Sequence, residues 1–161
     1  MSDEMFGGLD LDELSAPIPR GTYKLQLKDV NDRAANTQYG EPERRFKIFN
    51  FSIVEAPEGN EDAEQFEGES TKGLFLNYWP NLKSDIGTMD SSQKSQVRKS
   101  ATLYKKLAQA FGASPEEIRS GSVDWDSYVG SYIYATVFPN NQDGQPQIDQ
   151  NSFQHESSVE I

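Results

Sequence analysis

The chain has 161 residues, no cysteine and a formal net charge of −11, so we expect one hydrophobic core and exclude disulfides and thiolate sites. No apolar run approaches the roughly 18 residues that span a bilayer, and the acidic N-terminus lacks the basic and apolar regions of a signal peptide. We therefore expect a cytoplasmic protein without a membrane partner.

The negative charge is concentrated in two segments. Residues 1–17 carry five acids and no base, and residues 55–71 carry seven acids and no base. By contrast, residues 20–54 hold seven bases against four acids, and residues 72–106 hold seven bases against two acids. The net negative charge of the whole chain argues against a nucleic-acid ligand. Because acids and bases lie in different segments, however, the sequence predicts a basic patch on the folded part.

The composition predicts one domain with two tails. Residues 1–17 mix acids with apolar side chains and end in a Pro-rich break, which is typical of a flexible acidic tail. Residues 18–155 form the predicted domain, and residues 156–161 a short polar tail. Within the domain, alternating side chains predict five strands at residues 21–30, 43–55, 71–79, 131–139 and 146–156.

A helical pattern separates the third strand from the fourth. Asp90 and Gln93 have the spacing of a capping box, apolar residues follow at helical intervals, and Gly112 is a C-terminal stop. A short second helix begins after Ser114. The predicted fold class is therefore mainly β, an OB-fold-like five-stranded Greek-key barrel with its main helix between strands 3 and 4. A generic β-sandwich is the alternative.

Residues for catalysis, a cofactor or a metal are not indicated. The single histidine, His155, lies near the end of the chain without a second histidine or a cysteine, and we interpret it as a solvated surface residue. No phosphate-binding loop or nucleophile motif is present. Asp124 and Asp126 flank Trp125, which we interpret as turn chemistry. We expect the protein not to be an enzyme.

The strand residues divide by parity into a predicted core and a predicted binding face. The predicted core consists of Phe46, Ile48, Val54, Leu74, Leu76, Ile133 and Val137. On the opposite face of the strands, basic and aromatic side chains alternate. Proteins that bind single strands hold phosphates with basic side chains and stack nucleobases on aromatic rings. The predicted phosphate contacts are Lys24, Lys28, Arg44, Arg45, Lys47 and Lys72, and the predicted stacking residues are Phe49, Phe51, Tyr78, Trp79, Tyr132 and Tyr134. For each of these aromatic residues, packing under the predicted helix is the alternative to contact with a ligand.

Several stretches resemble the small phage-encoded single-stranded DNA-binding proteins of OB-fold type. They are "GTYKLQLKDV", "RRFKIFNFSIVE", "LYKKLAQAFG", "WDSYVGSYIYATV" and the strand after "NNQDGQ". The resemblance implies binding of single-stranded DNA without sequence preference in the host cytoplasm. It also implies contact with replication or recombination proteins through an acidic tail, although here the more acidic tail is N-terminal. We expect that tail to occupy the basic groove when DNA is absent.

Two other functions are compatible with the sequence. A structural or assembly protein would use the aromatic strand faces for subunit contacts. An acidic inhibitor that mimics DNA would depend on the net charge of −11 itself. The sequence does not predict the oligomeric state, and a homo-oligomer is one of the alternatives.

Overall fold

The computed structural model describes residues 5, 7, 8, 10, 12 and 16–158. Most of the predicted acidic tail therefore lies outside the described residues, as do residues 159–161 of the predicted C-terminal tail. No helix in the described ranges is long and apolar enough to cross a membrane.

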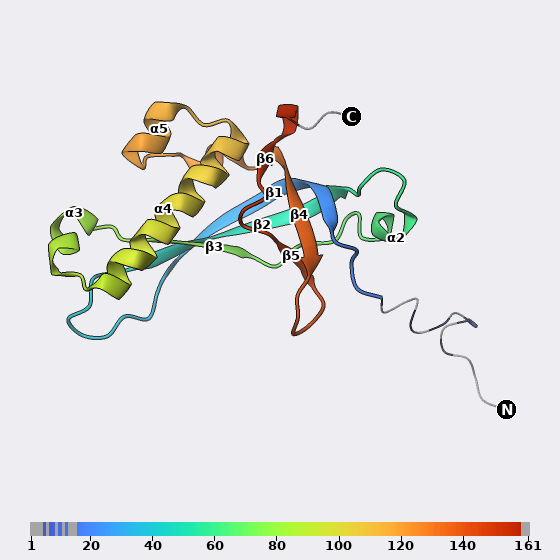
Figure 1. The fold of residues 1–161 in the computed structure, drawn as a ribbon, viewed down its shortest axis with the longest axis horizontal. Coiled ribbons are helices and arrows are strands. Elements are labelled where there is room, and N and C mark those ends of the chain that lie inside the picture. Colours follow the sequence, from blue (N-terminus) through green and yellow to red (C-terminus); the bar gives the residue numbers. More distant parts are fainter. Residues whose placement is uncertain (1–4, 6, 9, 11, 13–15, 159–161) are drawn as a thin grey trace.

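The architecture is an antiparallel sheet curled into a barrel (Figure 1). Its strands are β1 (Gly21–Ala34), β2 (Arg45–Glu55), β3 (Leu74–Tyr78), β4 (Tyr132–Pro139), β5 (Pro146–Ile148) and β6 (Gln154–His155). The strand order is β3-β2-β1-β4-β5, and β6 also pairs with β4. The Lys72 N–H, just before β3, donates to the carbonyl of Pro146 in β5 at 2.8 Å, which brings the two edges of the sheet together. The result is a nearly closed five-stranded barrel, and the predicted OB-like fold class is confirmed.

The last predicted strand is divided in two. Ile148 of β5 lies opposite Val137, and His155 of β6 lies opposite Ile133, so both pieces pair with β4. Between them the Ser152 hydroxyl accepts the N–H of Thr136 at 2.7 Å. A side chain thus replaces the ladder hydrogen bond where the strand is interrupted.

Four helices and three short 3-10 turns accompany the described sheet. They are α2 (Glu61–Glu64), α3 (Leu82–Asp85), α4 (Ser91–Phe111), α5 (Pro115–Ser120), η1 (Ile86–Thr88), η2 (Trp125–Tyr128) and η3 (Glu156–Ser158). The predicted capping box is confirmed, because the Asp90 carboxylate accepts the Gln93 N–H at 2.8 Å and the Gln93 side chain accepts the Asp90 N–H at 3.0 Å. Gly112 ends α4 at φ 82°, and Ser114 caps α5 as predicted.

The two faces of β2 are reversed relative to the sequence prediction. Phe49 and Phe51 are fully buried, whereas Phe46 and Ile48 are only partly buried. The cause lies in distant segments, since the ring of Trp125 meets Phe49 edge-on at 5.0 Å. Similarly, the ring of Phe111, at the end of α4, stacks on Phe51 at 6.3 Å. The predicted core residues of β3 and β4 are buried as expected; they are Leu74, Leu76, Ile133 and Val137.

The strand β1 is longer than predicted, and the strands with which it pairs change along its length. Its first half pairs with both β2 and β4, and its second half continues to Ala34, opposite Arg45. The register shifts between Leu27 and Asp29, so Lys28 is an extra residue at a bulge. The second half therefore forms a three-stranded arm with β2 and β3. In Figure 1 the C-terminal end of α4 meets the barrel, while its N-terminal end projects beyond it together with α3.

Candidate nucleic-acid interface

A hollow of about 680 Å³ lies between the end of β3 and the middle of α4, and we call it the β3–α4 groove. Residues of β2, α5 and η2 complete its walls. Its aromatic and basic lining residues are Lys47, Tyr78, Trp79, Tyr104, Lys105, Arg119 and Trp125. None of the described residues that line it is acidic. In a chain of net charge −11, the lining of this hollow therefore combines aromatic and cationic groups.

The floor of the groove is held by aromatic packing. Trp125 is buried and meets the ring of Tyr104 edge-on at 5.4 Å. The Tyr104 hydroxyl accepts the N–H of Val123 at 3.0 Å and donates to the carbonyl of Glu117 at 3.4 Å. Burial is the main cause that raises the pKa of Tyr104 above its ordinary value. The floor is thus a fixed, uncharged surface at neutral pH.

The rim of the groove is more accessible. Tyr78 and Trp79 are partly exposed, because β3 ends at Tyr78 and Pro80 stops the strand after Trp79. Both side chains line the groove opposite α4. They offer aromatic surface of the kind on which a flat ring can stack.

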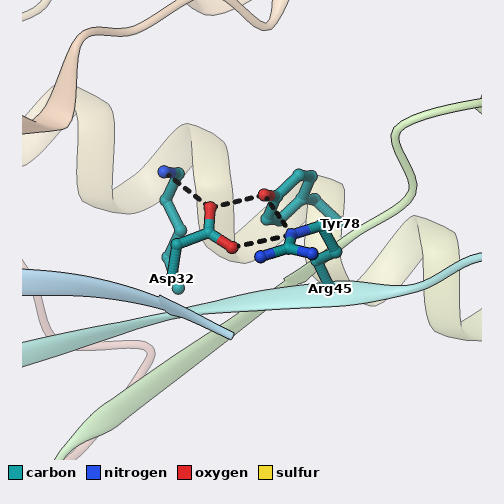
Figure 2. A network of polar contacts seen from close by, with 4 residues as sticks. Asp32, Arg45 and Tyr78 are labelled. Atoms are coloured by element: carbon teal, nitrogen blue, oxygen red, sulfur yellow. Dashed lines mark hydrogen bonds and ion pairs between the residues drawn. The ribbon is translucent and has the colours of Figure 1, made fainter. Parts of the chain in front are cut away.

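Lys47 and Tyr78 of the groove form one polar network with Asp32 and with Arg45, which lies outside the lining (Figure 2). Arg45 Nε donates to one carboxylate oxygen of Asp32 at 2.8 Å. Lys47 Nζ lies 3.2 Å from the other oxygen, which also accepts the hydroxyl of Tyr78. Asp32 reaches them because the arm of β1 sets it directly opposite Lys47. The network fixes the positions of these side chains. Its two cations and one carboxylate give it a net positive charge.

The pKa of Asp32 reflects this network. Partial burial alone would raise the pKa, but the hydrogen bonds from Tyr78, Arg45 and Lys47 lower it below the ordinary aspartate value. Burial and the hydrogen bond to Asp32 raise the pKa of Tyr78. At neutral pH the carboxylate is therefore charged and the phenol is not.

A second group of predicted residues lies on the outer face of the barrel. Lys24 Nζ is 4.8 Å from the centroid of the Tyr132 ring, and Tyr134 lies opposite Lys24 in the β1–β4 register. Gln26 Nε2 donates weakly to the Tyr132 hydroxyl at 3.4 Å. These side chains point away from the core, whereas Lys47 shares its face with buried Phe49. The outer group is therefore separate from the β3–α4 groove.

The other predicted residues lie elsewhere. Phe49 and Phe51 are core residues and offer no accessible ring, so their prediction as stacking residues is wrong. Lys72 contributes its backbone to the barrel closure and pairs its Nζ with Asp143 at 2.8 Å. Arg44 donates to the Asn77 side chain at 2.9 Å, and Lys28 is exposed at the bulge of β1.

Several candidate residues were not among those predicted from the sequence. Tyr104, Lys105 and Arg119 enter the groove from α4 and α5, and only their positions in space connect them with β3. The feature of the sequence that could have indicated a basic surface here is the composition of α4, which has five basic residues and no acidic one. On the outer side of the sheet, Phe75 is 55% exposed and its ring lies 5.4 Å from that of Phe46.

Within the described ranges, no three histidine, aspartate or glutamate side chains lie close enough together to hold a metal ion. Comparison of the chain with protein-family models, curated proteins and solved structures found no match. The geometry of the chain's own residues is therefore the basis for assigning a function.

Proposed function

We propose that the protein binds single-stranded DNA without sequence preference and acts without catalysis in DNA replication or recombination. One observation carries the proposal. The β3–α4 groove places the aromatic rings of Tyr78 and Trp79 beside the cations Lys47, Lys105 and Arg119, and none of its described lining residues is acidic. Rings that stack bases beside cations that hold phosphates are the two components of single-strand binding sites on OB-folds.

The components have distinct tasks in this proposal. The bases stack on Trp79 and Tyr78 at the rim, where every nucleobase presents an equivalent flat face. Lys105 and Arg119 attract the phosphates from the α4–α5 side, and Lys47 attracts them from β2. Neither stacking nor charge reads base edges, so the binding does not depend on sequence.

The acidic character of the chain is compatible with a polyanionic ligand. Seven acids lie in residues 55–71, the segment that contains α2. Figure 1 places α2 at the opposite end of the molecule from α3 and the N-terminal end of α4. The screening length in physiological salt is about 8 Å. Carboxylates at the far end therefore repel little of a strand in the groove.

We expect a fluorescent oligo-dT to bind at low salt and to dissociate as salt increases. Because phosphates release counterions on binding, log K should fall linearly with log salt, with a slope of about −0.7 for each phosphate contacted. Fluorescence anisotropy at several NaCl concentrations measures this slope. Absence of binding at low salt would contradict the proposal and would favour an assembly protein or an acidic DNA mimic.

Asp32→Asn should strengthen single-strand binding by roughly two- to fivefold. The carboxylate of Asp32 pairs with Arg45 and Lys47 and thus competes with an incoming phosphate. Asp143→Asn is a matched control, since Asp143 pairs with Lys72 outside this network and outside the groove. Competition titrations with unlabelled oligo-dT compare the two variants. Weaker binding of Asp32→Asn would mean that the carboxylate mainly positions the two cations.

A further inference from the structure

A second hollow, of about 390 Å³, lies on the other side of α4, and we call it the α4 cleft. One wall is α4 itself, and the other is the turn between β5 and β6. Arg98, Lys99 and Lys106 line it; among the described residues, the one hydrogen bond from these three side chains runs from Lys106 Nζ to the Asn151 side chain at 2.7 Å. As in the groove, none of its described lining residues is acidic.

An exposed ridge of α4 connects the cleft with the groove. Residues 94, 98, 101 and 105 have helical spacing i, i+4, i+7 and i+11, so they follow one stripe of the helix. All four are exposed. Lys105 also lines the groove and Arg98 also lines the cleft. The ridge therefore carries Lys105 on the groove side and Arg98 on the cleft side, with the small side chain of Ala101 between them.

No carboxylate in the described part of the chain pairs with the five bases of α4. The ion pairs of Asp32, Asp143 and Asp149 involve bases of other elements. A run of cations without internal counter-ions attracts an extended polyanion, and each contact releases counter-ions.

We propose that a single strand bound in the β3–α4 groove crosses the ridge of α4 and that its next phosphates bind in the α4 cleft. This inference rests on the proposed function. An α-helix with its side chains is about 10–12 Å thick, so the bound chain must bend sharply within a few nucleotides. A duplex has a persistence length of about 150 base pairs and cannot follow this path. The crossing of α4 thus makes the protein selective for single strands.

The test uses two oligo-dT lengths, about 4 and about 16 nucleotides, which bracket the site sizes of OB-folds. The variant is Lys99→Gln with Lys106→Gln, which changes only the cleft. The matched control is Lys28→Gln with Arg33→Gln, which removes the same charge from exposed positions that line neither hollow.

The cleft variant should bind the long oligonucleotide on the order of tenfold more weakly, with a salt slope reduced by about 1.4 for two lost phosphates. It should bind the short oligonucleotide, and a duplex of 16 base pairs, as the unmodified protein does. Equal effects at both lengths, no effect at either, or an equal effect of the control would overturn the crossing and leave the proposed function intact. If the unmodified protein binds neither oligonucleotide at low salt, both proposals are wrong.

Discussion

Phe49→Ala should lower the free energy of unfolding by about 3–5 kcal/mol, because it removes a fully buried ring from the centre of the barrel. The ring of Phe49 contacts Trp125 edge-on, and Trp125 in turn contacts Tyr104 of α4. A cavity at this position would therefore loosen the barrel and the floor of the groove together. Urea unfolding followed by circular dichroism measures the change.

The matched control for this prediction is Phe46→Ala, the same substitution on the opposite face of the same strand. Phe46 is only partly buried and its ring contacts the exposed ring of Phe75. We expect this substitution to cost about 1 kcal/mol, close to the value of one aromatic pair. A larger loss for Phe46→Ala than for Phe49→Ala would show that β2 turns its other face to the core.

Trp79→Ala should weaken oligo-dT binding by about 1–3 kcal/mol, which corresponds to roughly 5- to 150-fold in affinity. The ring of Trp79 lines the groove and is partly exposed, so its loss removes a stacking surface and leaves the buried core in place. Anisotropy titration at low salt gives the affinity. A thermal melt of the variant shows whether the fold is retained.

Phe75→Ala is the informative partner of this experiment. Phe75 lies in β3, four residues before Trp79, and projects from the outer side of the sheet, where it is 55% exposed. OB-folds commonly bind oligonucleotides on the face of strands 2 and 3, so the two variants compare two surfaces directly. Loss of affinity in Phe75→Ala but not in Trp79→Ala would place the strand on the outer face and contradict the assignment of the groove.

The helix α4 could be predicted from the sequence because its limits are encoded locally. The capping box needs only Asp90 and Gln93, and the left-handed end needs only Gly112. The order of elements followed in the same way from alternation and helical spacing. Those features were enough to predict an OB-like barrel.

The faces of β2 could not be predicted in this way. Both parities of the strand carry large apolar residues, so a period of two defines two faces without saying which is inside. The inside is determined by Phe111 and Trp125, which lie more than fifty residues further along the chain. The same limit applies to the candidate site. Lys47, Tyr78 and Trp79 were predicted from strand patterns, but the cations of α4 and α5 meet them only after folding.

The central position of β1 affects how the chain folds while it is being synthesised. The first half of β1 pairs with β4, whose residues lie more than one hundred positions later in the sequence. Until β4 has left the ribosome, the edge of β1 from Gly21 to Gln26 has no partner in the native sheet. An unpaired edge is a template for association with other chains. A chain that terminates after α5 should therefore aggregate, although it contains β1, β2, β3 and α4 in full.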